Sequence, residues 1–462
     1  MPITKIMRPN TRKIHAIDLA ELLDDKARII APRRAKITPT RTIIPQKFNM
    51  FFLRLLDIIK DMRKTTHSSV DSRLKAKLEL SKRQTIKTKQ IVCLISIVKN
   101  ESKIIERMLS SALEVLDIEC CSIVDTGSDD NTKDLISKWC TKHKISFVIH
   151  NEPFVNFSYN RTDSFRRAKL SFPDAQIGVL SDADFVWKGG PLNRNLLFKD
   201  DFSVEQRHGT SLAFSNIRLI KMSHDWTCIG VTHEYWDVPG TSLSSGMLKK
   251  VWIEDVSDGG CKTDKYERDI KLLETALEVG VFEPKYLESR YLFYLGESYK
   301  NSCRYKDSIN THVRKLSLKD DFLEYNYYSM YSISVCYTKL AEQQDFEDNY
   351  ILALEWTKKA FELLPERAEA IYDMVKFCRI HRKYEDAMKW IKIGSAIKYP
   401  LYLHLFVRPD CYEYLFDYEL SIVASYIGAL SEGEKAMERL LTDPKIPEIY
   451  RKYAEENAHF YL

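Results

Sequence analysis

A regular alternation of apolar strands with helical patterns between residues 90 and 180 limits the fold of this chain most strongly. The predicted strands are 91–98, 121–124, 146–149 and 177–180, and the predicted helices are 101–116, 132–143 and 159–170. The first strand is a continuous run rich in β-branched residues, which is typical of a parallel strand buried on both faces. Strands that alternate with helices predict an α/β sheet built from βαβ units.

Polar side chains follow three of these strands at the points where the strands end. The three segments are Val98-Lys99-Asn100-Glu101, Asp125-Thr126-Gly127-Ser128 and Ser181-Asp182-Ala183-Asp184. Because ligands in such sheets bind outside the carboxyl ends of the strands, this edge is the predicted site. Asp182 and Asp184 could together hold a hard divalent cation and a diphosphate. Turns also attract Asp for its bonds to the backbone, so the pair alone leaves a structural role open.

From about Tyr286 the pattern becomes all-helical and contains an internal repeat. The repeat aligns small residues that share one position, namely Ser308, Ala353, Ala387 and Ala436. The interval from Ala353 to Ala387 is 34 residues, the length of a tetratricopeptide repeat (TPR). The other intervals, 45 and 49 residues, require insertions, for example around 341–348 and 399–412. We predict roughly four degenerate repeats, with a plain helical bundle as the alternative.

The N-terminal part of the chain is strongly basic. Residues 1–90 contain 22 Lys and Arg against 8 Asp and Glu, whereas acidic residues exceed basic ones in the remainder. A solvated leader and an arm that binds an anionic surface both fit this composition. One amphipathic helix is expected near 47–63, packed on the next domain or in peripheral contact with a membrane. Nucleic acid is a disfavoured partner because the arm lacks regularly interleaved aromatic residues.

The sequence contains no apolar run of about 18 residues, the length that a membrane-spanning helix needs. No secretory signal is visible, and the ten cysteines form neither CxxC pairs nor clusters of the kind that bind zinc. We therefore expect a cytoplasmic protein, with peripheral membrane contact as the alternative. The expected organisation is a basic extension at 1–89, a catalytic domain at 90–285 and helical repeats at 286–462.

Taken together, these motifs resemble family 2 glycosyltransferases of the GT-A fold, in the branch with a C-terminal TPR array. The matching segments are 98–101, 125–128, 156–162, 182–184, 230–235 and 258–260. The resemblance covers about residues 90–310 by motif. It implies a Rossmann-like nucleotide-sugar-binding domain, followed by an all-α region of TPR-like repeats.

The resemblance also implies roles for individual residues in the donor site. The residues implied to bind the donor nucleotide are Val98, Asn100, Glu101, Asp125, Asp130, Arg161 and Asp182. Among these, Asp125 contacts the base and Asp130 supports its loop, although capping of the next helix is an alternative for Asp130. Asp184, with Asp182, is implied to bind Mn²⁺ or Mg²⁺ at the diphosphate. Phe185 departs from the family, which usually has an acidic or polar residue there.

An inverting transfer needs a base for the acceptor hydroxyl, and Glu234 is the candidate, with Asp255 and Asp258 as alternatives. His233 would bind metal or orient the site, or be a buried structural histidine. Tyr235 and Trp236 offer flat faces for a sugar ring, with core packing as the other role. Lys262 and Lys265 would reach the phosphates from a glycine-containing loop, or lie on an ordinary basic loop.

The expected function is therefore a metal-dependent, inverting glycosyltransferase that uses a nucleotide sugar, with UDP-sugars favoured. Its acceptor would be a hydroxyl on a glycan, a lipid or a protein. The repeats would bind a protein partner or a second copy of the chain, since TPR arrays form concave grooves. The alternative is an inactive transferase-like domain that serves, with its repeats, as a protein-interaction module.

Overall fold

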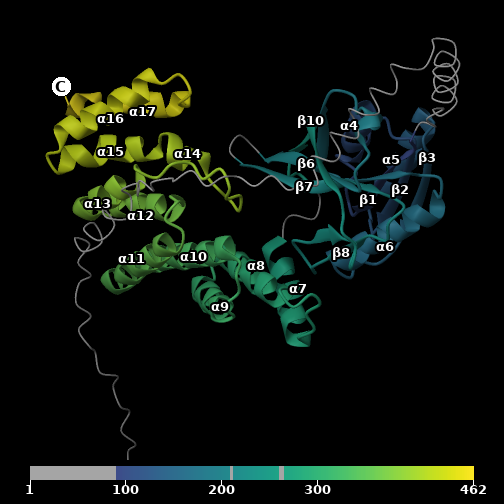
Figure 1. Ribbon diagram of the computed structural model, residues 1–462, viewed down its shortest axis with the longest axis horizontal. Helices are drawn as coiled ribbons and strands as arrows, with labels where there is room; N and C mark the ends of the chain where they lie inside the picture. Colours follow the sequence, from purple (N-terminus) through teal and green to yellow (C-terminus); the bar gives the residue numbers. More distant parts are fainter. Residues whose placement is uncertain (1–89, 209–211, 260–264, 462) are drawn as a thin grey trace, which may run out of the picture. The chain divides into compact units, whose positions relative to one another are not determined.

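The computed structural model describes residues 90–208, 212–259 and 265–461 (Figure 1). The predicted basic extension with its helix near 47–63, and Lys262, lie outside these residues. The strands are β1 Val92–Val98, β2 Cys120–Asp125, β3 Ser146–Asn151, β4 Ile177–Leu180, β5 Phe185–Gly189, β6 Asp201–His208, β7 Leu212–Lys221, β8 Thr227–Ile229, β9 Tyr235–Asp237 and β10 Ser245–Asp255. The helices before the repeats are α4 Ile105–Leu116, α5 Thr132–His143, α6 Phe157–Ser171 and α7 Lys265–Val279, with a short 3₁₀ turn η1 at Arg194–Leu196.

Eight of these strands form one mixed sheet in the order β3-β2-β1-β4-β7-β6-β10-β5. The first four are parallel, β7 is antiparallel to β4 and β6, and β10 is parallel to β6 and antiparallel to β5. Strands β8 and β9 form a separate antiparallel pair. The predicted α/β alternation is confirmed, and the predicted helix 132–143 and strand 177–180 match α5 and β4 residue for residue.

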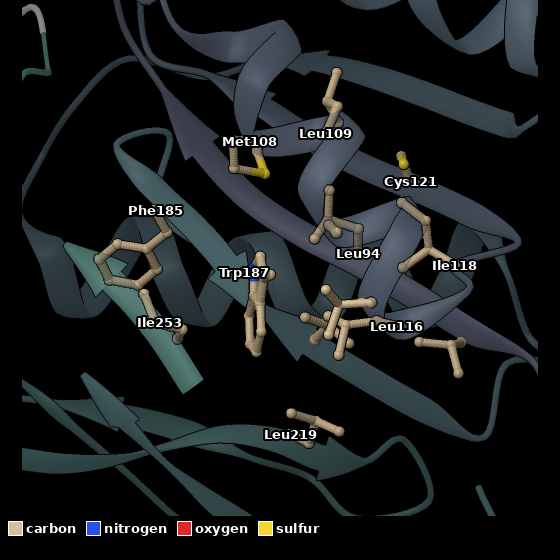
Figure 2. Close-up of a cluster of buried hydrophobic side chains, with 14 of the residues drawn as sticks. Leu94, Met108, Leu109, Leu116, Ile118, Cys121, Phe185, Trp187, Leu219 and Ile253 are labelled. Carbon is tan, nitrogen blue, oxygen red and sulfur yellow. The ribbon is translucent and has the colours of Figure 1, made fainter. Parts of the chain in front are cut away.

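Strand β1 is buried on both faces, as its continuous apolar run predicts. Val92 and Leu94 belong to one core with α4 and α5, whereas Cys93 and Ile95 belong to a second core with α6. Figure 2 shows the first core, with the Trp187 indole among surrounding apolar side chains that include Leu94. Successive apolar residues from Val92 to Ile95 therefore stabilise the two helix layers alternately.

The same core fixes the turn that carries the two aspartates. The Trp187 indole is 1% exposed, and its Nε1 donates a 3.1 Å hydrogen bond to Ser181 Oγ. The backbone N–H of Trp187 donates to Ser111 Oγ of α4 at 3.0 Å. Because Ser181 immediately precedes Asp182, this packing sets where the Asp-x-Asp turn leaves the sheet.

The C-terminal part is helical and built from hairpins. Its elements are α8 Leu287–Asn301, α9 Tyr305–Ser317, α10 Leu323–Ala341, α11 Phe346–Leu363, α12 Glu369–Ile380, α13 Tyr384–Gly394, α14 Pro409–Glu413, α15 Leu415–Tyr426, α16 Leu430–Thr442, α17 Glu448–Asn457 and η2 Ala458–Phe460. The aligned residues Ser308, Ala353, Ala387 and Ala436 lie on α9, α11, α13 and α16 and are all 0% exposed. The alignment therefore identified the second helix of four successive hairpins, as a TPR-like array requires.

The extra length in the longer repeats is distributed in two ways. In the second repeat it lengthens α10 and α11, which have 19 and 18 residues, and only 342–345 connect them. Residues 341–348 are thus the end of α10, a four-residue turn and the start of α11, and the extra length lies in the two helices. Between α13 and α14 there is a true insertion near the expected place, and it folds back onto α10, because Glu324 accepts hydrogen bonds from the backbone of His404 and Leu405.

Helix α7 packs with the helices that follow it. Its Ile270 and Leu273 share a core with Leu287 and Tyr291 of α8.

In the described part of the chain, no helix has both the length and the apolar character that crossing a bilayer requires.

Candidate active site

A cleft of about 870 Å³ lies at the carboxyl edge of the parallel strands. Val98 at the end of β1 is paired with Asp125 at the end of β2, and Leu180 ends β4 beside Ile95 of β1. Eleven of the predicted site residues line the cleft: Val98, Glu101, Arg161, Asp182, Asp184, His233, Glu234, Tyr235, Trp236, Asp255 and Lys265. The strand ends therefore converge on one cavity, as expected from their parallel order.

Asp125 is buried behind the cleft wall, where it holds the loop that follows β2. Its Oδ1 accepts hydrogen bonds from the backbone N–H groups of Gly127 at 3.0 Å and Ser128 at 2.9 Å. Its Oδ2 has no hydrogen-bond partner among the described residues. Asn100 braces the same loop, since its N–H donates to Ser128 Oγ and its Oδ1 accepts from the Asp129 N–H. Thr126, next to Asp125, lines the cleft.

Asp130 connects two loops through backbone bonds. Its carboxylate accepts from the N–H groups of Ser102 at 3.1 Å and Thr132 at 3.0 Å, where α5 begins. Burial opposes its charge, but the bonds from Thr132 and Ser102 outweigh it and lower the pKa of Asp130 to about 2. Because Asp130 is absent from the cleft lining, its contacts are those of a loop support.

Asp182 lies between two arginines. Its Oδ1 is 2.7 Å from Arg161 Nη2, and its Oδ2 is 3.6 Å from Arg218 Nη1. The side chains of Arg161 and Arg218 are only 13% and 11% exposed. Both carboxylate oxygens of Asp182 thus face a guanidinium, and this carboxylate is already neutralised by the protein.

Arg161 also extends across the cleft to Glu234. Its Nε donates to Glu234 Oε1 at 2.5 Å. Burial opposes the charge of Arg161, but Asp182 and Glu234 outweigh it and raise the pKa of the guanidinium. One planar guanidinium therefore holds two carboxylates from distant parts of the chain, a geometry that suits arginine rather than lysine.

The segment around Arg161 explains how the chain places it there. Ser158 Oγ donates to the Cys228 carbonyl at 2.5 Å, and Thr162 Oγ1 accepts from the Cys228 N–H at 2.9 Å. These two hydroxyls attach one side of α6 to β8, so that Arg161 projects toward the loop between β8 and β9. Asn160 has a different role, because its amide bonds to the backbone of Pro153 and Val155 and is fully buried.

Asp184 and Glu101 lie near one another beside Gly259. A Cβ built on Gly259 would be 3.4 Å from Glu101 Oε1 and 3.7 Å from Asp184 Oδ2. Among the described residues, no cluster of three or more His, Cys, Asp or Glu is arranged to hold a metal ion. Mg²⁺ commonly takes one or two carboxylates and completes its shell with substrate phosphates and water. Asp184, with Glu101 nearby, fits such a shared cation, whereas Asp182 is held by its arginines.

Arg218 of β7 is a cleft residue that the sequence analysis missed. Its Nη2 donates to Gln206 Oε1 at 2.8 Å, and its guanidinium lies 4.6 Å from the centre of the Phe185 ring. Burial lowers the pKa of Arg218, against the opposing effect of Asp182. Phe185, the residue that departs from the family pattern, thus serves as an apolar support for this arginine. The sequence contains only a weak indication that Arg218 belongs to the site. The polar residues Asn216 and Arg218 are two positions apart and therefore lie on the same side of a strand.

His233 is partly buried, and its ring lies parallel to the Tyr294 ring of α8, with centroids 3.9 Å apart and planes at 4°. Burial, followed by Lys265 and Arg290, lowers the pKa of His233 to about 3, so the imidazole is neutral at pH 7.

Trp236 is 8% exposed and packs in the α6 core against Phe165, although it also reaches the cleft lining.

The alternative bases differ in what surrounds them. Asp258 forms a two-pronged ion pair with Arg107 of α4, at 2.8 and 2.6 Å. Asp255 lines the cleft and accepts from both the N–H and the hydroxyl of Ser257. Lys265 lines the cleft at the start of α7.

Comparison with known families finds a match for the part that contains strands β1 to β5. Residues 93–200 match the model of the family described as Glycosyl transferase family 2. The chain therefore carries a domain of this family, which includes strands β1 to β5 and the Asp-x-Asp turn. No match was found among curated proteins.

Among solved structures, the chain is similar to TPR proteins and to MamA. The TPR protein YrrB, described as having an unusual peptide-binding site, is 14% identical over 42% of this chain and 84% of its own, with a TM-score of 0.29. A thermophilic TPR protein in Thermus thermophilus is 14% identical over 42% and 91%, with a TM-score of 0.31. A structure of MamA is 16% identical over 43% and 85%, with a TM-score of 0.27. The assignment of TPR-like hairpins rests on the buried small residues described above.

Proposed function

We propose that the chain, which carries a family 2 glycosyltransferase domain, moves a glycosyl group from a nucleotide sugar to a hydroxyl acceptor in the cleft. The observation that carries the proposal is the bridge from Arg161 to Asp182 and Glu234. It joins Asp182, which follows strand β4, to Glu234 in the segment between β8 and β9, and both carboxylates line the cleft. A donor and an acceptor bound between these walls would be adjacent.

The donor half of the proposal uses the strand ends. When the loop after β2 opens to admit the nucleotide, the unpartnered Oδ2 of Asp125 would accept an N–H of the base, such as that of uracil, which supports a UDP-sugar. Asp184, with Glu101 nearby, would hold a divalent cation that neutralises charge on the leaving diphosphate. Lys265, at the cleft wall, would approach the phosphates.

Glu234 is the proposed base in a single displacement that inverts the anomeric carbon. The acceptor hydroxyl gives its proton to the Glu234 carboxylate while its oxygen forms a bond to the anomeric carbon. The bond from that carbon to the phosphate oxygen breaks, and the nucleoside diphosphate leaves. Arg161 orients Glu234 through its 2.5 Å bond, as general-base catalysis requires.

The organisation of the remainder is also part of the proposal. We place the transferase domain at 90–285 and the helical repeats at 286–462, and we assign the repeats to a protein acceptor, a partner or a second copy of the chain. The series of helical hairpins supports this role, because TPR arrays form concave surfaces that bind extended segments.

The test measures nucleoside-diphosphate release from UDP- and GDP-sugars with Mn²⁺ or Mg²⁺, while thermal shift follows donor binding. Asp184→Asn should abolish turnover. Asp225→Asn is the matched control, since Asp225 is 93% exposed and pairs with Lys169 on the surface. Metal-dependent turnover of one donor, lost only in Asp184→Asn, supports the proposal. Neither turnover nor stabilisation by any donor would overturn it and favour the inactive interaction module.

A further inference from the structure

One side of α8 faces the segment that carries Glu234. Residues 231–235, here called the Glu234 segment, connect β8 to the start of β9. The facing residues are Tyr286, which directly precedes α8, and Arg290, Tyr291 and Tyr294 of α8, here together called the α8 face. Their spacing of four, five and eight positions places them on one side of a helix. These residues belong to the part of the chain predicted as helical repeats.

The α8 face contacts the Glu234 segment at several points. Arg290 Nη2 donates to the His233 carbonyl at 2.6 Å, and Tyr291 Oη accepts from the Val231 N–H at 3.3 Å. The hydroxyls of Tyr235 and Tyr286 are hydrogen-bonded. Together with the stacked rings of His233 and Tyr294, these bonds hold both the backbone and the side chains of the segment.

The backbone of the segment needs this support. His233 has a φ of 50°, in the left-handed region that residues with side chains seldom occupy. Such a conformation persists when surrounding contacts over-determine it. Here the α8 face holds the residue twice, by its ring and by its carbonyl. Since Glu234 follows directly, the conformation of His233 sets the direction in which Glu234 leaves the backbone.

Arg290 is itself fixed on its other sides. Its Nη1 donates to Tyr325 Oη of α10 at 2.8 Å. Its guanidinium also lies 5.4 Å from the centre of the Tyr235 ring and 5.0 Å from that of Tyr294. Arg290 therefore joins the first two helical hairpins to the cleft wall, without lining the cleft itself.

We propose that Arg290 is a positioning residue for glycosyl transfer, which acts through the His233 carbonyl to hold Glu234 toward the acceptor. The inference rests on the proposed function, because it takes Glu234 as the base. It makes the first helical hairpin part of the catalytic machinery, so the helical region sets the turnover rate as well as any binding of partners.

The test compares Arg290→Gln and Arg290→Lys in the full chain. Arg314→Gln is the control, because Arg314 lies on α9 of the same hairpin and pairs with Glu288 on the surface at 3.2 Å. For each variant, kcat, donor Kd and thermal stability are measured, together with hydrogen exchange of the peptide covering 230–237. Arg290→Gln should lower kcat at least tenfold with donor Kd within threefold, and exchange in that peptide should rise. Arg290→Lys should recover part of kcat, and Arg314→Gln should match the wild type.

Two results would overturn the proposal. The first is an Arg290→Gln variant whose kcat stays within twofold of the wild type. The second is a parallel loss of donor binding, turnover and thermal stability, which indicates a purely structural role. If the wild type turns over no donor, the proposed function fails by itself. Hydrogen exchange then tests whether Arg290 holds the Glu234 segment in place. Increased exchange of the 230–237 peptide in Arg290→Gln supports this contact, and unchanged exchange rejects it.

Discussion

Arg161 donates a 2.5 Å hydrogen bond to Glu234, and the same guanidinium lies 2.7 Å from Asp182. The three side chains are 13%, 16% and 24% exposed, so water screens their charges only in part. A partly buried carboxylate pair is tolerated when a cation satisfies both members. The bridge is therefore important for the stability of the cleft as well as for its geometry.

Replacing Arg161 should separate these two contributions. Arg161→Gln leaves Asp182 and Glu234 without their shared cation, and should lower the free energy of unfolding by about 3 kcal/mol. Arg161→Lys restores a charge but not the planar fork, so it should recover stability while kcat stays at least tenfold low. Urea unfolding and donor turnover measure the two effects. An Arg161→Lys variant with wild-type kcat would contradict the bridging role.

Asp125→Asn should weaken binding of the nucleotide. The asparagine keeps an oxygen for the N–H groups of Gly127 and Ser128 but replaces the unpartnered Oδ2 with an amide donor. An N–H of the base would then face another donor, and the loss of a bond to a charged group is about 2 kcal/mol, or roughly thirtyfold in Kd. Calorimetric titration with UDP and GDP measures the change. Unchanged affinity for both nucleotides would exclude Asp125 as the base contact.

The convergence of the site could be predicted because it depends only on strand order. Parallel strands place their carboxyl ends at one edge, so Glu101 and Asp184 meet wherever the βαβ alternation holds. The site role of Arg218 could not be predicted in this way, because its place depends on the antiparallel pairing of β7 with β4. That pairing is long-range and leaves no local pattern. The aspartate motif likewise gave no sign that arginines already occupy both oxygens of Asp182.

The repeats show the same distinction between local and long-range information. Small residues at equivalent positions of the repeats identified the second helix of each hairpin, because only a small side chain fits where two helices approach closely. The contact of α8 with His233 joins the repeats to the other part of the chain, and no repeat pattern encodes it. Side chains such as Arg290 are therefore visible only in the folded structure.

Gly296→Ala should destabilise the first hairpin. A Cβ at this position would lie 2.5 Å from Nε2 of His312, whose ring is completely buried and has little room to move. Overpacking of this kind costs about 1–3 kcal/mol, which exceeds the gain of at most about 1 kcal/mol from better helix propensity. Gly190→Ala is the control, because no atom lies within 4 Å of the added Cβ. Equal unfolding free energies for the two variants would show that the hairpins are not packed as described.

Lowering the pH should destabilise the protein through His233. Burial, with Lys265 and Arg290, lowers the pKa of His233 to about 3, whereas an unfolded histidine titrates near about 6.5. Below that unfolded pKa the unfolded chain takes up a proton that the folded chain does not, so stability is lost as pH falls. At pH 5 the loss from this residue should be about 2 kcal/mol relative to pH 7.

His233→Asn isolates this contribution. Asparagine tolerates the left-handed backbone at this position and carries no titrating group. The burial of His312 also lowers its pKa, and that residue is present in both proteins, so its effect cancels in the comparison. Urea unfolding at pH 7, 6 and 5 should show a smaller pH-dependent loss in His233→Asn than in the wild type. Equal losses would mean that His233 is protonated in the folded protein, and its stacking on Tyr294 would then have to include a charged imidazolium ring.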